Sequence, residues 1–304
     1  MRKNPNLFLS AAAAFILTLL ILLYPSECLY YACNGLNLWF EKMIPTLFPF
    51  MVLSGIIIRM DLTDYFVKLV KPLLTPLFRI NGNCLYVIIT GFLCGFPMGA
   101  VVTAQLYERK MLTKKEAEFL LSFCNNIGPV YFISFALPAM GIQNSILPFL
   151  FGMYGIPLLY GIFLRNTLFR NCLKAHHEPK DRNPPVTSLL KAMDKSVMSS
   201  LTGITKLGGY MIIFNLLNVI PALFLGKNET AKAIMCAFLE ITGGLSYLGN
   251  RAPTVSLIML CFGGLSCMAQ TNSSLQGTDL SLKHYMIHKT ILTVICACYY
   301  IFLV

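Results

Sequence analysis

Charged residues are scarce in this chain of 304 residues, and acidic ones are the scarcest. Asp, Glu, Lys and Arg make up 12% of the chain, and only 13 residues are Asp or Glu. A soluble domain has roughly twice this share of charge, so a soluble globular fold is excluded. The hydrophobic content of 56% and the mean hydropathy of +0.67 instead predict a polytopic membrane protein, with the lipid bilayer as its surroundings.

Catalytic and metal-binding motifs are also absent. No His-Glu-x-x-His, Gly-x-Ser-x-Gly or phosphate-binding Gly-rich loop occurs, which argues against an intramembrane protease or an ATP-driven pump. We therefore expect no enzyme activity, no cofactor and no metal. His284 and His288 stand one helical turn apart, but a third ligand is missing, and we expect both at the membrane surface beside Lys283 and Lys289.

Long apolar runs take the place of charge. Ten can be drawn, at roughly 7–24, 44–60, 65–79, 85–107, 117–139, 146–168, 199–225, 230–248, 252–276 and 285–304. The runs 65–79 and 230–248 are short or carry charges, so each is a crossing, a re-entrant hairpin arm or an interfacial helix. We predict an all-α fold with about 8–10 transmembrane segments. No cleavage site follows the first run, which predicts an uncleaved signal anchor over 1–30.

The 24 Lys and Arg residues lie mainly in short loops, with clusters at 109–115 and 165–195. Because no basic domain holds them, no nucleic-acid partner is expected. The positive-inside rule places the N-terminus and both clusters in the cytoplasm, and ten crossings would then place Lys283 and Lys289 outside. The predicted domains are a first helix (1–30), a first Gate-like half (36–168), a cytoplasmic basic linker (169–197) and a second Gate-like half (198–304).

Two of the apolar runs are interrupted at their middle. The run 85–107 contains several Gly and a Pro, and the run 117–139 contains an Asn pair, Gly and Pro. Irregular backbone at membrane depth is tolerated only where protein buries it or where it lines a wet cavity, and paired broken helices point to a transporter's binding site. Residues 264–275 echo residues 95–106, so we predict two inverted-repeat halves with discontinuous helices or re-entrant hairpins.

The interrupted runs contain motifs that resemble a known family. They are GFPMGA at 95–100, a basic loop at 107–118 and LLSFCNNIGP at 120–129, while FLEITGG and GGLSCMAQ in the second half match the family's second Gate-like segment. The chain resembles the YlbJ-type sporulation integral membrane proteins, whose "nucleoside recognition" Gate domain is also found in concentrative nucleoside transporters. It departs from the family at Val101 and Met268, where basic residues are frequent.

The resemblance implies a cell-membrane protein of an endospore-forming bacterium, placed in the outer forespore membrane. It also implies that the protein carries dipicolinate, a small planar anion, during sporulation. These expectations come from the resemblance and not from composition or spacing.

A dipicolinate site needs donors for two carboxylates and a slot for a flat ring. Half-helix N-termini and polar side chains at the breaks supply donors, and Phe96 and Phe123 are predicted to sandwich the ring. The predicted substrate-binding residues are Gly95, Phe96, Pro97, Gly99, Ser122, Asn125, Asn126, Gly128, Gly264, Ser266, Gln270 and Asn272. The alternatives are helix packing for the glycines and structural hydrogen bonding for the two adjacent asparagines.

Glu240 is the one carboxylate well inside an apolar run, and an intramembrane ionisable residue is a functional hypothesis by default. It is predicted to carry a coupling proton or Na⁺, or to pair with Lys206 or Lys71. Lys206 is also predicted to offset the charge of the substrate. The alternative is an interfacial helix with Glu240 solvated.

We therefore expect a secondary transporter or facilitator of a small anionic metabolite. A Gate-type nucleoside or nucleobase transporter would use nearly the same groups. A non-transporting sporulation scaffold is the alternative from another class, and it should tolerate Asn125→Ala and Gly95→Leu, whereas a transporter should not. The oligomeric state is open, and a homo-oligomer is one alternative.

Overall fold

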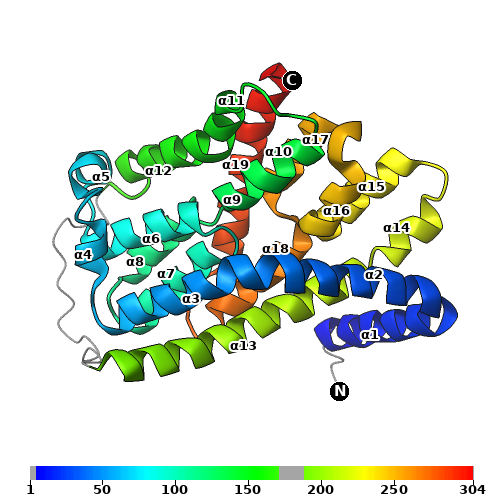
Figure 1. The fold of residues 1–304 in the computed structure, drawn as a ribbon, viewed down its shortest axis with the longest axis horizontal. Helices are drawn as coiled ribbons and strands as arrows, with labels where there is room; N and C mark the ends of the chain where they lie inside the picture. The colour runs from blue at the N-terminus through cyan, green and yellow to red at the C-terminus, as the bar shows by residue number, and fades with distance from the viewer. Residues whose placement is uncertain (1–4, 171–187, 304) are drawn as a thin grey trace.

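The computed structural model of the protein describes residues 5–170 and 188–303, and the regular structure of this part is entirely helical (Figure 1). The first half contains α1 (Pro5–Leu23), α2 (Pro25–Leu38), η1 (Trp39–Met43), α3 (Ile44–Arg59), α4 (Thr63–Val67), α5 (Lys71–Phe78), α6 (Gly82–Leu93), α7 (Met98–Glu108), α8 (Lys114–Leu121), α9 (Pro129–Tyr131), η2 (Phe132–Ala136), α10 (Leu137–Ala139), α11 (Leu147–Leu150), η3 (Phe151–Gly155) and α12 (Ile156–Asn166). The second half contains α13 (Leu189–Leu216), α14 (Val219–Phe224), α15 (Glu229–Leu239), α16 (Ile241–Leu248), η4 (Gly249–Arg251), α17 (Pro253–Phe262), α18 (Gly264–Leu275) and α19 (Leu282–Leu303). The predicted all-α fold class is confirmed.

Several stretches of helix are long and apolar enough to cross a membrane, as an integral membrane protein requires. Within the described residues there are five, namely Pro25–Arg59, Leu147–Asn166, Leu189–Phe224, Pro253–Leu275 and Leu282–Leu303. The pair α5 and α6, bent by 106°, makes six if it is counted as one span. The hydropathy of the sequence predicts more, about 8–10 segments. The number is smaller because breaks divide several apolar runs into helices that are too short to cross the bilayer.

The breaks fall where Gly, Pro and polar residues were predicted to unwind the helices. Gly95 separates α6 from α7, and an irregular stretch ending at Gly128 separates α8 from α9. In the second half Glu240 separates α15 from α16, and Gly263 separates α17 from α18. Gly95 and Gly263 both have a φ of +89°, a conformation that side chains with a Cβ rarely adopt. The prediction of discontinuous helices is confirmed.

Two of the broken segments turn back on themselves. Helices α15 and α16 pack side by side, and a Cβ added at Gly244 in α16 would meet the backbone of Ala237 in α15. Helices α6 and α7 also pack together, and Asn83 at the start of α6 donates a hydrogen bond of 3.2 Å to the carbonyl of Met111, beyond the end of α7. The run 230–248 therefore forms a hairpin of two short helices instead of one crossing helix. The other doubtful run forms α4 and α5, which are both too short to span.

The loops at one end of the molecule gather into a basic face. Lys114 forms an ion pair of 2.8 Å with Asp279, so the loop before α8 lies beside the loop before α19. Arg59 at the end of α3 donates a hydrogen bond of 3.1 Å to Ser199 of α13, and α4 and α5 lie at the same end, on the left of Figure 1. The predicted placement of Lys283 on the side opposite Lys114 is wrong, because the run 230–248, which lies between them in the chain, returns instead of crossing.

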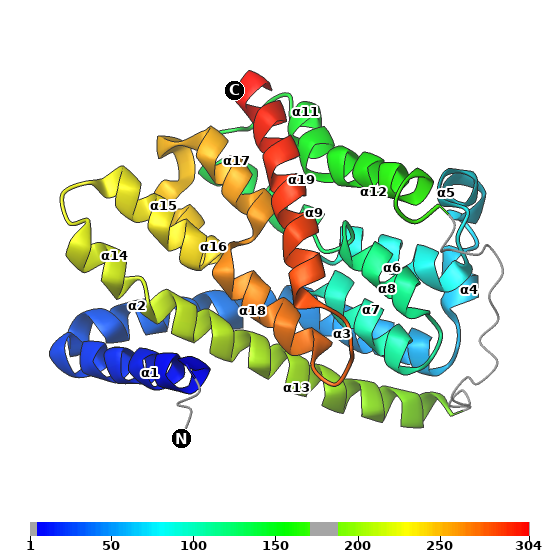
Figure 2. The same ribbon diagram turned by 180° about the vertical axis from the view of Figure 1, so that it is seen from behind.

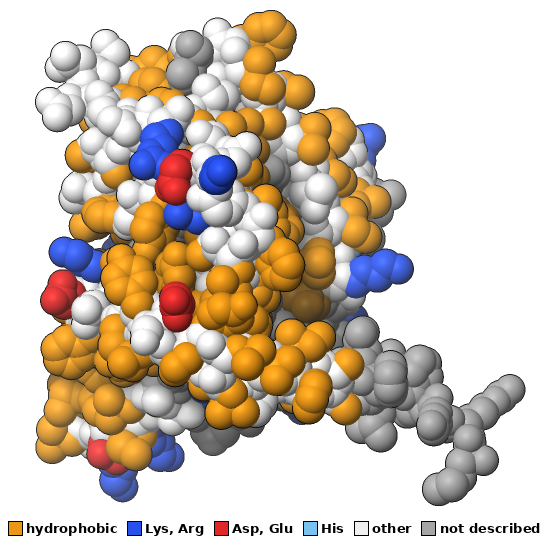
Figure 3. All heavy atoms as spheres, turned by 90° about the vertical axis from the view of Figure 1, so that its right-hand side faces the viewer, with side chains coloured by type: hydrophobic (Ala, Val, Ile, Leu, Met, Phe, Trp, Pro, Cys, Tyr) orange, Lys and Arg blue, Asp and Glu red, His pale blue; other side chains and the backbone are white. Residues whose placement is uncertain are grey.

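The opposite end of the molecule, formed by α14, α15 and η4, carries few charges. Figure 3 shows this face as mainly apolar, with charged side chains only in small groups. Glu229 forms ion pairs there of 3.1 Å with Lys232 and 3.4 Å with Arg251. The uneven distribution of Lys and Arg between the two ends supports a cytoplasmic location for the basic face.

Helix α13 connects the two halves of the chain. It begins at Leu189, so the last part of the predicted linker is helical, while residues 171–187 lie outside the described residues. Ala192, Ser196 and Ser200 are buried at every fourth position, and this stripe of small residues lets α13 lie along α3, as Figures 1 and 2 show. Because α13 packs along both α2 and α3, the second half does not form a separate body.

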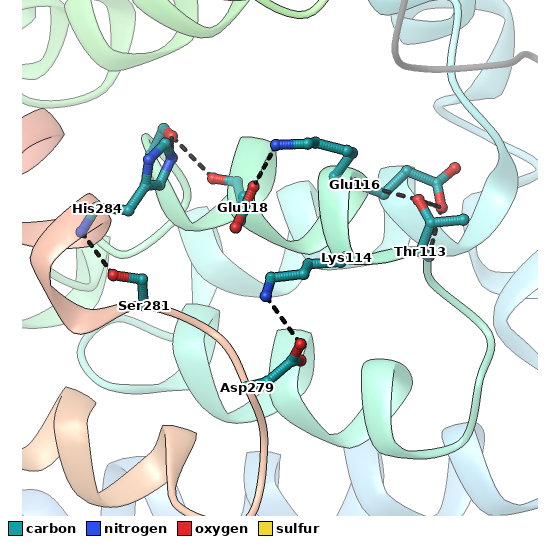
Figure 4. Close-up of polar contacts among 9 residues, drawn as sticks. Thr113, Lys114, Glu116, Glu118, Asp279, Ser281 and His284 are labelled. Carbon is teal, nitrogen blue, oxygen red and sulfur yellow. Dashed lines mark hydrogen bonds and ion pairs between the residues drawn. The ribbon is translucent and has the colours of Figure 1, made fainter.

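The contact between the loops of the basic face depends on pH. In Figure 4 the side chains of Lys114 and Asp279 point toward each other. Hydrogen bonds from Lys114 and from the Tyr107 hydroxyl lower the pKa of the Asp279 carboxyl, and the same contact raises the pKa of Tyr107 to about 12. The contribution of Asp279 is therefore present above the ordinary carboxyl pKa and is lost as the pH falls through its folded value. The contribution of Tyr107 is lost as the pH rises through about 12.

We expect a fluorophore on a cysteine at exposed Gln276 to become more mobile at acidic and at strongly alkaline pH. Anisotropy of the label measures this mobility. The variant Asp279→Asn should show the mobile signal already at neutral pH, because it removes the negative charge that pairs with Lys114 and one of the two acceptor oxygens. An anisotropy that does not change with pH in the unmodified loop would contradict the coupling.

Candidate functional site

Three of the breaks meet at one cavity of about 320 Å³, a volume in the range of small-molecule sites. Its lining includes the exposed residues Phe50, Leu93 and Val130, so the cavity opens at the surface of the molecule. Its walls come from α3, the two hairpins, the break before α9, α13 and α18. Most of the wall is apolar, with a few polar groups from Thr46, Tyr131, Thr242 and Gln270. The Tyr131 hydroxyl is buried beside Thr242 and forms no hydrogen bond of ordinary geometry with the described residues, so it is available to a water or a ligand.

Part of the predicted site lies in this wall. Gly95, Phe96, Gly128, Glu240 and Gln270 all line the cavity. Nine other predicted residues do not line it, namely Pro97, Gly99, Ser122, Asn125, Asn126, Lys206, Gly264, Ser266 and Asn272. The structure thus brings together the residues at the tips of the breaks and leaves out those further along the helices.

Glu240 is buried at the tip of the α15–α16 hairpin, so the alternative of a solvated interfacial residue is wrong. Its carboxylate accepts hydrogen bonds from the backbone N–H of Gly243 at 2.7 Å and of Thr242 at 3.1 Å, and from the Asn215 side chain at 3.1 Å. These donors do not include the predicted partners Lys206 and Lys71. Glu240 therefore caps α16 with its own carboxylate, which occupies the positive end of that helix.

Lys289 in α19 was missed as a site residue. Its side chain is 4% exposed, and Nζ donates a hydrogen bond of 2.9 Å to the carbonyl of Asn125 and lies 3.5 Å from Oδ1 of Asn126. Nζ also lies 4.4 Å from the centre of the Phe96 ring, which is a cation–π contact. Phe96 in turn lines the cavity. A lysine inside the last apolar run was the available signal, but its place near the start of that run suggested the membrane surface.

The two adjacent asparagines connect the break before α9 to other helices. Nδ2 of Asn125 donates to the Thr271 hydroxyl at 3.0 Å and to the Tyr285 hydroxyl at 3.2 Å. Nδ2 of Asn126 donates to the carbonyl of Phe123 at 2.7 Å. The amide nitrogens of both residues are thus used by protein groups, which favours the alternative of structural hydrogen bonding for Asn126. Oδ1 of Asn125, however, is buried and has no hydrogen-bond partner among the described residues, so this atom is still available to a water or a ligand.

The histidine pair was predicted to lie at the membrane surface, but in the structure both side chains are covered by other helices. His288 is buried, and its Nδ1 lies 2.6 Å from the Tyr160 hydroxyl. His284 is half-buried, with Nε2 3.1 Å from the Ser122 hydroxyl. The end of α8 and helix α12 pack against the first turns of α19, which is why these residues are covered.

The predicted ring sandwich between Phe96 and Phe123 is wrong. Phe123 is buried in the core of the first half, where its ring stacks on Phe78 with centroids 5.7 Å apart. Of these two residues Phe96 alone lines the cavity, together with the aromatic residues Phe50 and Tyr131. Phe123 lies in the turn that ends α8, so its side chain points away from the tip of the break.

Several predicted binding residues hold helices together instead. A Cβ at Gly99 would meet the carbonyl of Cys124, and a Cβ at Gly264 would lie 3.1 Å from the carbonyl oxygen of Ala237. Ser266 accepts a hydrogen bond of 2.9 Å from Gln270, while Asn272 is exposed on α18. For these two glycines the alternative of helix packing fits the structure better.

The chain is similar to known membrane proteins. Residues 40–157 match the Gate family, described as nucleoside recognition. Over 333 aligned positions the chain is 26% identical to the sporulation integral membrane protein YlbJ of Bacillus subtilis (strain 168), and the alignment covers 93% of this chain and 79% of that protein. No solved structure matches the chain. The Gate match includes the breaks at Gly95 and Gly128, which line the cavity.

Proposed function

Because this chain is similar to the sporulation membrane protein YlbJ and carries a Gate segment, we propose that it is a secondary transporter or facilitator of a small planar anion. The observation that carries the proposal is the cavity at which three helix breaks converge, at Gly95, Gly128 and Glu240. Discontinuous helices that meet around an interior cavity are the usual binding-site architecture of secondary transporters. A scaffold would need neither the breaks nor the cavity.

Dipicolinate is the substrate that we propose, with transfer across the outer forespore membrane as its role. Phe96 offers a face for a flat ring, and Lys289 behind it supplies a positive charge that no carboxylate of the described residues neutralises by an ion pair. The hydroxyl of Tyr131 and the amide of Gln270 are donors in the same wall. The sporulation membrane and the substrate rest on the resemblance to YlbJ.

A nucleoside or nucleobase is the second candidate, and Glu240 favours it. The carboxylate lies in the cavity wall, where it can accept hydrogen bonds from sugar hydroxyls or ring N–H groups. The same negative charge would repel a dianion. The Gate description, nucleoside recognition, also agrees with this candidate.

Uptake by proteoliposomes separates the two candidates. We expect the purified protein to take up labelled dipicolinate in preference to uridine, and Phe96→Ala to lower this uptake by about 3- to 10-fold, the loss of one aromatic contact. Phe302→Ala is the matched control, because Phe302 is 92% exposed on α19. Selective uridine uptake would overturn the substrate, and equal uptake by wild type and Phe96→Ala would remove Phe96 from the site.

A further inference from the structure

A second cavity, of about 200 Å³, lies between α7, α13 and α18. We call it the vestibule. Its wall is more polar than that of the first cavity and includes Gln105, Glu108, Ser199, Lys206, Ser273 and Ser274. None of these residues except Lys206 entered the predicted site.

The vestibule begins at the basic face. Glu108 is the last residue of α7, and Ser199 accepts the hydrogen bond of 3.1 Å from Arg59 at that face. From there the wall extends along α13 to Lys206 and Tyr210. The vestibule therefore leads from the basic face toward the middle of the molecule.

Lys206 needs an aqueous surrounding. It is exposed and lies near the middle of the span Leu189–Phe224, where a charged side chain in hydrocarbon is costly. Intramembrane charges of this kind face a bundle interior or a water-filled cavity. The polar wall of the vestibule provides such a surrounding, and Glu108 is its only acidic side chain.

The vestibule and the first cavity share part of their walls. Gln270 and Leu207 line both of them. Gln270 is 6% exposed, and its side chain donates a hydrogen bond of 2.9 Å to the Ser266 hydroxyl, which holds it in place across the boundary. The two residues thus form a thin partition, contributed by α18 and α13.

We infer that the two cavities are consecutive parts of one aqueous route, in which Lys206 binds a carboxylate anion at the vestibule and Gln270 with Leu207 controls its passage to the first cavity. The anion as cargo rests on the proposed function, whereas the route itself does not. Lys206 supplies a single accessible charge, which suits a transient first contact. The partition is made of two side chains, so a rotamer change is enough to open it.

Thiol labelling tests the route without any substrate. A cysteine introduced by Ser274→Cys reports on the vestibule, and native Cys94 reports on the first cavity. Both are used in a protein in which the exposed Cys33 and Cys298 are replaced by Ser. We expect membrane-impermeant methanethiosulfonates to label Ser274→Cys from the basic face only. At Ser274→Cys, the labelling rate of an anionic reagent is divided by that of a cationic one. Lys206→Met should lower this ratio by about threefold or more, because the positive charge that attracts the anionic reagent is lost.

The partition is tested at Cys94. We expect Gln270→Ala to raise the labelling rate of Cys94 from the basic face at least about tenfold, and Leu207→Ala to do the same. The melting temperature of both variants in detergent should stay unchanged. Labelling of Ser274→Cys from the opposite face, or an unchanged rate at Cys94 in both variants, would overturn the route. If the labelling is as expected but dipicolinate uptake fails, the route stands and only the proposed substrate is wrong.

Discussion

Replacing Lys289 by Gln is expected to lower dipicolinate uptake on the order of 100-fold, the cost of removing a buried hydrogen-bonded charge. Lys289 is the only buried lysine in residues 5–170 and 188–303, and it contacts three residues of the two first-half breaks. Gln keeps a donor for the carbonyl of Asn125 but removes the charge. The measurement is the concentration dependence of uptake in proteoliposomes, in which KM for the dianion should rise.

Lys283→Gln is the matched control, because Lys283 is exposed one turn and a half earlier on the same helix. It should leave uptake unchanged. If the protein transports uridine instead, Lys289→Gln should affect that neutral substrate much less. Normal uptake of dipicolinate by well-folded Lys289→Gln would show that this cation does not serve the site.

Gly99→Ala is expected to destabilise the protein, with a loss of about 1–3 kcal/mol or more in the free energy of unfolding. The added Cβ would meet the carbonyl oxygen of Cys124, and it would lie 2.8 Å from the carbonyl carbon and 3.0 Å from Cα of Asn125. These are backbone atoms at the break before α9, so they cannot move aside like a flexible side chain. The melting temperature in detergent measures the loss.

Gly209→Ala should have the opposite effect. No heavy atom lies within 4 Å of the position of its Cβ, and Gly209 lies inside α13. Alanine is favoured over glycine in a helix by about 1 kcal/mol, so the melting temperature should stay the same or rise slightly. A similar melting temperature for both variants would contradict the close packing at Gly99.

The breaks at glycine could be predicted because their cause is local. Gly95 and Gly128 interrupt apolar runs that would otherwise continue as helix, and glycine disfavours a helix whatever lies around it. Both residues line the cavity. The break at Glu240 could not be predicted in this way, because Glu favours a helix. The inverted relation between the two halves stays a prediction.

The partners of each polar group could not be predicted, because they lie far along the chain. Asn125 finds Thr271 and Tyr285, which are more than a hundred residues away. The sequence predicts Lys289 at the membrane surface, because this residue lies near the start of the last apolar run. The position of a residue along a run does not show which helices surround the end of that run.

The sequence by itself determined that this protein is an all-helical membrane protein with broken helices and one basic side. Composition, helix-breaking residues and loop charge are properties that the chain carries without reference to its folding partners. Only the tertiary structure decided that two of the apolar runs return instead of crossing and that Lys289 lies buried behind Phe96. A hairpin and a crossing pair of helices have the same hydropathy, and they differ only in the packing of their backbones, as at Gly244 against Ala237.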